Sequence, residues 1–122
     1  MPLPMKRHSF VRRLGFAMYG IRAAWRRERN FRIQLVFAGA LVGLLVALRP
    51  GFYWAAIFLM VAALVLSAEM INSALEALID HLHPDIHPEI RIIKDMAAGA
   101  VLVFSLTALL IAALFAWQTW LV

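Results

Sequence analysis

The sequence predicts an all-α membrane protein with an N-terminal amphipathic surface helix and three transmembrane helices. Of its 122 residues, 64% are hydrophobic and 16% are charged, and the mean hydropathy is +0.82. A soluble domain is about 45–50% apolar, and one this small could not bury so many apolar side chains. We therefore exclude a soluble enzyme, a disordered tail and a nucleic-acid module. The absence of cysteine excludes disulfides, zinc–thiolate sites and a cysteine nucleophile.

The N-terminal segment, residues 1–32, is strongly basic. It contains nine Lys and Arg residues and one acid, Glu28, so its net charge is +8, whereas the rest of the chain carries −3. A basic segment followed directly by a hydrophobic body favours contact with an anionic inner leaflet over contact with nucleic acid. The positive-inside rule then places the N-terminus in the cytoplasm. A secretory signal peptide is the alternative, which the length of the basic region disfavours.

Residues 10–27 are expected to form the surface helix. At 100° per residue, their apolar side chains fall within an arc of about 120°, and basic side chains lie on the other side. This pattern is typical of a helix that lies in the plane of the membrane interface. The apolar set consists of Phe10, Leu14, Ala17, Met18, Ile21, Ala24 and Trp25.

Three apolar stretches follow within a single membrane domain, residues 1–122. A span needs about 20 residues to cross a hydrocarbon core of about 30 Å. The predicted spans are 33–48, 52–79 and 96–122. Arg49-Pro50-Gly51 forms a tight external turn between the first two. Residues 80–95 form a cytoplasmic loop, and the C-terminus lies outside.

The loop 80–95 contains three histidines, at positions 81, 83 and 87, and two prolines. Pro84 and Pro88 prevent one continuous helix through it. The histidines suggest either a metal site or an exposed polar loop. We favour the polar loop, because no fixed ligand geometry is implied.

The second span carries a polar stripe at its cytoplasmic end. Glu69, Asn72, Glu76 and Asp80 lie within an arc of about 80° on a helix, and Ser73 is adjacent. Glu69 follows Phe52 by 17 residues, or about 25 Å of helix, so the stripe begins near the inner membrane edge. Acids are costly against lipid, and the stripe therefore needs a protein or water-lined environment.

The stripe has two interpretations. Its carboxylates pair only with the N-terminal arginines, or they form a catalytic site at the interface. Glu28 favours the second, since Glu28 and Glu76 together would make a hard oxygen site of the kind that holds Mg²⁺ with substrate phosphates. Lys94 and Asp95 open the third helix on the same side, where a lysine can contact phosphate. Signatures of soluble kinases are absent from the sequence.

Two motifs in this region resemble the prokaryotic diacylglycerol kinase family. They are E-M-I-N-S-A-L-E-A at 69–77 followed by Asp80, and K-D-M-A-A-G-A-V at 94–101. The resemblance covers nearly the whole chain, including G-I-R-A-A-W at 20–25, Glu28 and Phe31-Arg32. Two positions depart from it, because Ser9 and Phe16 stand where the family usually has an arginine and a tyrosine near the nucleotide.

The resemblance implies a homotrimeric lipid kinase of the bacterial inner membrane that passes the γ-phosphate of MgATP to a lipid hydroxyl. By position, Glu69 would be the general base, and Glu28 and Glu76 would hold Mg²⁺. The lipid would be bordered by Glu69, Arg22, Trp25 and Arg32. The nucleotide would be bound by Glu28, Asn72, Glu76, Asp80, Asp85, His87, Lys94 and Asp95.

Diacylglycerol, giving phosphatidic acid, is the expected substrate. Undecaprenol is the alternative, because Arg29-Asn30-Phe31-Arg32-Ile33 and Ala97-Ala98-Gly99 resemble the undecaprenol kinase branch. The rival from another class is a small multidrug-type transporter that trades protons at a membrane carboxylate. A structural membrane subunit without activity is the third possibility.

Overall fold

The computed structural model describes residues 9–122, and within this range all its secondary-structure elements are helices. The prediction of an all-α chain is therefore confirmed. The first eight residues of the basic N-terminal segment, with Lys6 and Arg7, lie outside the described residues. The elements are the α-helices α1 (Phe10–Arg27), α2 (Arg29–Leu48), α3 (Phe52–Leu82) and α4 (Pro88–Ala116), and a π-helical turn η2 (Trp117–Leu121).

Three of these helices are long and apolar enough to cross a membrane. They are α2 with 20 residues, α3 with 31, and α4 continued by η2 with 34. The number of predicted spans agrees with this. However, α2 begins at Arg29, before the predicted start at 33, because the chain turns into it directly after Glu28.

The predicted loop 80–95 is wrong in extent, since only residues 83–87 are non-helical. Helix α3 runs on to Leu82, and α4 begins at Pro88. Proline is well tolerated in the first turn of a helix, where its missing N–H leaves no bond unmade. The ring of His87 caps that turn by accepting a hydrogen bond from the Glu89 N–H at 3.1 Å. Pro84 lies in the break, as predicted.

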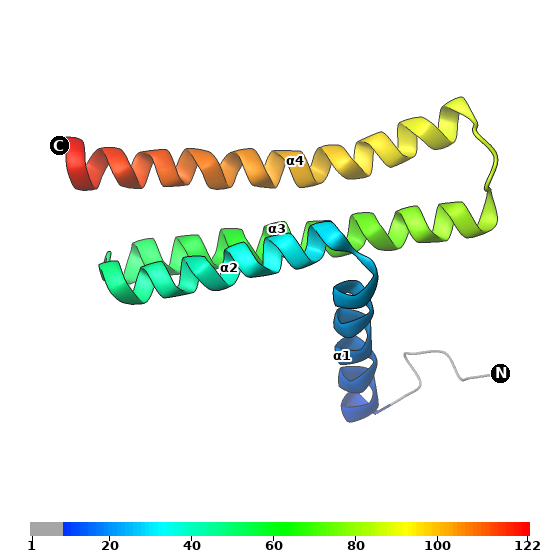
Figure 1. Cartoon of the computed structure of the whole chain (residues 1–122), viewed down its shortest axis with the longest axis horizontal. Helices are drawn as coiled ribbons and strands as arrows, with labels where there is room; N and C mark the ends of the chain where they lie inside the picture. The colour runs from blue at the N-terminus through cyan, green and yellow to red at the C-terminus, as the bar shows by residue number, and fades with distance from the viewer. Residues whose placement is uncertain (1–8) are drawn as a thin grey trace.

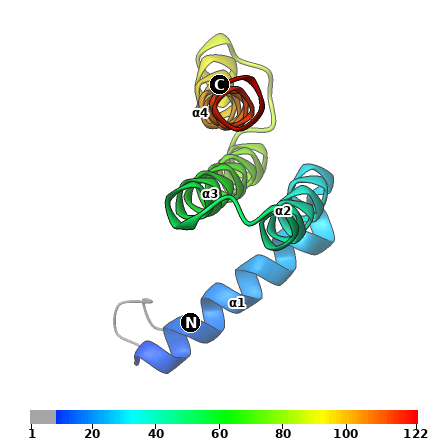
Figure 2. The ribbon, with the colours of Figure 1, turned by 90° about the vertical axis from the view of Figure 1, so that its left-hand side faces the viewer.

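Helix α3 is the central element. It packs against α2 on one side and α4 on the other, and α1 contacts α2. Figure 1 shows α2, α3 and α4 running alongside one another while α1 crosses their direction, and the end-on view of Figure 2 shows an open arrangement. Within residues 9–122, only Phe31 and Val61 are buried apolar residues. The apolar faces of the spans are therefore left for lipid or for other protein.

The corner between α1 and α2 is held by backbone and side-chain contacts. Glu28 is extended, with φ −112° and ψ 107°, and separates the two helices. The Nη1 of Arg32 donates to the carbonyl oxygens of Trp25 at 2.8 Å and Arg26 at 3.2 Å. Carbonyls in the last turn of a helix lack partners within it, so Arg32 caps α1 from the first turns of α2.

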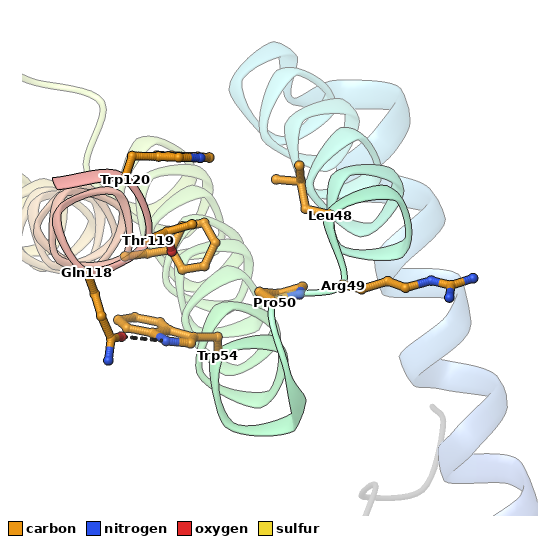
Figure 3. Close-up of a pocket in the computed structure, with 8 residues that line it drawn as sticks. Leu48, Arg49, Pro50, Trp54, Gln118, Thr119 and Trp120 are labelled. Atoms are coloured by element: carbon orange, nitrogen blue, oxygen red, sulfur yellow. Dashed lines mark hydrogen bonds between the residues drawn. The ribbon is translucent and has the colours of Figure 1, made fainter. Parts of the chain in front are cut away.

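The turn between α2 and α3 closes the opposite end of the molecule. Arg49 adopts φ 48° and Gly51 φ 102°, the left-handed region that glycine tolerates best. A cavity of about 490 Å³ lies between this turn and the end of α4. Figure 3 shows Pro50 and Leu48 facing Trp120 across it, while Arg49 points away. The Nε1 of Trp54 donates to Gln118 at 2.9 Å and so ties α3 to the end of α4.

Candidate active site

The predicted polar stripe of α3 contains all the buried polar residues of the described chain. Glu69 is 5% exposed, Asn72 9% and Ser73 8%. Spacings of three and four residues bring these side chains to one face of the helix. Glu76 is half-buried one turn further on, and Asp80 is exposed. The stripe therefore passes from the protein interior at Glu69 to the surface at Asp80.

Glu69 is held from the neighbouring helix by Gln34. The Nε2 of Gln34, on α2, donates to Oε2 of Glu69 at 3.3 Å. Gln34 is not among the predicted site residues. The sequence nonetheless contains an indication of its importance, since Gln34 is the one polar residue in the apolar stretch 33–48. A polar side chain in a span is costly unless it finds a bonding partner.

Two carbonyl oxygens in this cluster are buried without a hydrogen bond. They are Oε1 of Gln34 and Oδ1 of Asn72. The Nδ2 of Asn72 reaches Oε1 of Glu76 at the long distance of 3.5 Å. Buried acceptors of this kind are costly when they stay unpaired. The cluster around Glu69 therefore contains two buried acceptors whose hydrogen-bonding capacity is not satisfied within the described residues.

Glu28 and Glu76 flank Glu69 closely enough for their negative charges to act on it. Glu28 lines a groove of about 290 Å³ between α1 and α3, together with Arg27, Ser73 and Ala77. Its carboxylate makes no side-chain bond to cap α2. Both carboxylates are thus near Glu69, and Glu28 is not engaged in capping α2.

These two carboxylates suit Mg²⁺ in its usual protein setting. Among residues 9–122, His, Cys, Asp and Glu side chains nowhere form a group of three that could hold a metal by themselves. Mg²⁺ is commonly bound through one or two carboxylates, with phosphates and waters completing the shell. The carboxylate oxygens of Glu28 and Glu76 are of the kind that binds Mg²⁺ delivered with a nucleotide.

The corner between α3 and α4 gathers most of the other predicted nucleotide residues. A cavity of about 200 Å³ is lined there by Asp80, Asp85, His87 and Lys94. The Nζ of Lys94 donates to Oδ1 of Asp80, which links α4 to α3. Asp95 lies on the next position of α4 and pairs with Arg91, Nε to Oδ1, at 3.5 Å.

The ion pairs of the described residues lie at the α3–α4 corner and in the first turns of α4. In the part of the chain that the structure describes, they are Lys94–Asp80 and Arg91–Asp95. Neither involves Glu69, Glu76 or an N-terminal arginine. Among the described residues, Asp80 is the stripe acid that forms an ion pair, and its partner is Lys94 and not an N-terminal arginine.

Apart from Glu69 on α3, the predicted lipid-binding residues are spread along α1 and the start of α2. Arg22 is exposed, and Trp25 is 44% exposed. Arg32 is half-buried, and its guanidinium is engaged with the last turn of α1. The structure thus assigns Arg32 a capping contact that the sequence did not indicate. Ser9 likewise has a local contact, since its hydroxyl accepts from the Arg12 N–H at 3.3 Å.

Comparison with known proteins gives a consistent result. The family model described as prokaryotic diacylglycerol kinase matches residues 15–116. An undecaprenol kinase from Bacillus subtilis is 36% identical over 106 residues, which is 85% of each chain. A diacylglycerol kinase from Escherichia coli K12 is 28% identical over 108 residues, 88% of each chain. A diacylglycerol kinase from Synechocystis is 31% identical over 97 residues, which cover 79% of this chain and 55% of that relative.

Proposed function

The chain belongs to the prokaryotic diacylglycerol kinase family, and on this premise we propose that it transfers the γ-phosphate of ATP to the hydroxyl group of a membrane lipid. The observation that carries the proposal is the placement of Glu69. It is a buried carboxylate on a membrane-spanning helix, and the polar stripe leads from it to a charged corner. Such a path would connect the part of the membrane that a lipid can reach, at Glu69, with the surface that a nucleotide can reach, at the charged corner.

Glu69 acts in this proposal as the general base for the lipid hydroxyl. Along α3 it is the stripe acid farthest from the charged α3–α4 corner, so we expect it to be the one nearest the lipid hydroxyl. Phosphoryl transfer needs in-line positioning and charge neutralisation more than covalent chemistry. A base within hydrogen-bond reach of the hydroxyl contributes about 10²–10⁴ in rate.

The nucleotide side is formed by Glu28, Glu76 and the α3–α4 corner. Glu28 and Glu76 would hold Mg²⁺, which when bound offsets the charge of the ATP phosphates. Lys94 supplies a cation for phosphate once it exchanges its bond to Asp80. Asn72 and Asp95 border the nucleotide together with Asp80, Asp85 and His87, and the last three line the cavity at the α3–α4 corner.

The lipid side is formed by Glu69 with Arg22, Trp25 and Arg32 at the membrane surface. Diacylglycerol, giving phosphatidic acid, is the first substrate to test, because two of the relatives above are diacylglycerol kinases. Undecaprenol is the second, and the 36% identity to an undecaprenol kinase favours it. Both are lipid alcohols, and the roles of Glu69 and the nucleotide residues are the same for either.

The proposed enzyme sits in the bacterial inner membrane with its N-terminus in the cytoplasm. Helix α1 then lies on the inner surface, where its arginines meet anionic headgroups. We also expect a homotrimer. Three spans with so few buried residues leave large apolar faces, and small residues such as Gly39 and Gly43 allow close helix contacts.

One assay tests the proposed function. The chain is purified in detergent, and ADP release from MgATP is measured with diacylglycerol and with undecaprenol in separate reactions. We expect lipid-dependent ADP release and a radiolabelled lipid product from [γ-³²P]ATP. Absence of labelled product with both lipids would reject the lipid kinase assignment for these substrates.

A further inference from the structure

The contact between Gln34 and Glu69 joins two residues 35 positions apart in the sequence. Within the described chain, Gln34 is the one side chain that donates a hydrogen bond to Glu69. It uses Oε2 of the carboxylate, and Oε1 accepts no bond from these residues. A carboxylate with one oxygen held in this way has a fixed orientation and presents its other oxygen to an incoming group.

Gln34 also ends an apolar groove. The groove has a volume of about 170 Å³ and is lined on α2 by Gln34, Phe37, Ala38 and Leu41. Its lining from α3 and α4 is apolar, so Gln34 is its one polar residue. Leu41 follows Gln34 by seven positions, which corresponds to about 10 Å of helix. The groove therefore leads from hydrocarbon depth to the Gln34–Glu69 contact.

We propose that Gln34 is a positioning residue, which holds Oε2 of Glu69 so that Oε1 faces the lipid hydroxyl. The Oε1 of Gln34 is buried beside this contact and accepts no hydrogen bond from the described residues. This inference rests on the proposed role of Glu69 as general base. Gln34 acts through Glu69 and takes no proton itself, because an amide is neither an acid nor a base near neutral pH.

The test compares Gln34→Leu with the matched variant Gln118→Leu. Gln118 also joins two spans through one side-chain hydrogen bond, at the end of the molecule opposite Glu69. We expect Gln34→Leu to lower lipid turnover by about 10- to 100-fold, the scale of loss when a reacting group is misplaced. The KM for MgATP stays unchanged, and Gln118→Leu keeps normal turnover. Normal turnover in Gln34→Leu, or equal losses in the two variants, would overturn the proposal.

A double-mutant cycle separates positioning from a general packing role. Gln34→Leu is measured again in the Glu69→Gln background with [γ-³²P]ATP over long incubations. A residue that acts through Glu69 has nothing left to position there, so we expect no further loss. The same fractional loss in both backgrounds would show that Gln34 acts independently of Glu69.

An infrared measurement tests the Gln34–Glu69 hydrogen bond independently of whether the chain is a lipid kinase. The carboxyl band of Glu69 is identified as the band lost in Glu69→Gln. We expect it to shift in Gln34→Leu and to stay in place in Gln118→Leu, because only the first removes its hydrogen bond. An unmoved band would overturn the proposal, even if the wild-type chain phosphorylated no lipid tested.

Discussion

At the scale of single residues, the charged side chains of the site differ in their burial and in their bonding partners. Glu69 is enclosed by protein and bonded to Gln34, whereas Lys94 is bonded to Asp80 near the surface. Glu28 and Glu76 lie between these two environments. This gradient separates Glu69, the proposed base, from the groups that we propose for phosphate and Mg²⁺. Substitutions at Glu69 and Glu76 should therefore fail in different ways.

Glu69→Gln should bind MgATP almost normally and transfer almost no phosphate. Glutamine keeps the shape of the side chain but cannot accept the hydroxyl proton, and loss of a general base costs about 10²–10⁴ in rate. Nucleotide affinity and turnover are measured on the same preparation. Near-normal turnover would remove Glu69 from the mechanism, and lost nucleotide binding would move it to the ATP site.

Glu76→Gln should raise the Mg²⁺ concentration needed for activity while leaving the fold intact. The change removes one charged oxygen ligand and keeps the volume. The measurement is a Mg²⁺ titration of lipid phosphorylation at fixed ATP, with a thermal unfolding curve as the check on folding. An unaltered Mg²⁺ requirement would show that Glu76 is not a ligand.

At the scale of elements, the position of α1 depends on a single corner. Glu28 interrupts the helical path, and Arg32 returns from α2 to cap the carbonyls of Trp25 and Arg26. The groove that contains Glu28 lies between α1 and α3. A change in the seating of α1 would therefore alter the surroundings of a proposed metal ligand.

Arg32→Met should loosen α1 without unfolding the three spans. The variant loses two hydrogen bonds from a charged donor to exposed carbonyls, a net effect of about 1 kcal/mol. We expect trypsin to cleave within α1 faster than in the wild-type chain. The cleavage is measured by mass spectrometry of the N-terminal fragments. The matched variant is Arg29→Met. It also removes one trypsin cleavage site, but the side chain that it changes is exposed. Equal cleavage rates in the two variants would contradict the capping role.

At the scale of the whole molecule, the chain has two chemically different ends. The end with the α3–α4 corner carries Asp80, Asp85, His87 and Lys94, whereas the end with the α2–α3 turn carries an aromatic cluster and one cation, Arg49. In the cluster, the rings of Trp54 and Phe115 lie 5.2 Å apart and those of Phe115 and Trp120 lie 5.7 Å apart. Aromatic side chains at such positions are typical of a membrane–water interface. The charged end is the one we expect in the cytoplasm.

A cysteine at position 83 tests this orientation. His83 is exposed in the break between α3 and α4, and the chain has no native cysteine. His83→Cys should resist an impermeant thiol reagent added outside intact cells and react after the cells are opened. Ready labelling in intact cells would reverse the topology and remove the corner from contact with cytoplasmic ATP.

Local patterns in the sequence determined the helical class, the number of spans and the polar face of α3. They did so because apolar length and helical periodicity are set by neighbouring residues. They also indicated the breaks at Arg49-Pro50-Gly51 and at Pro84. The tertiary structure alone decided that Gln34 bonds Glu69, that Arg32 caps α1 and that Lys94 bonds Asp80. These contacts depend on how separate segments pack together; the Gln34–Glu69 bond, for example, depends on the packing of α2 on α3. The periodicity of one segment does not specify which residue of another segment it will contact.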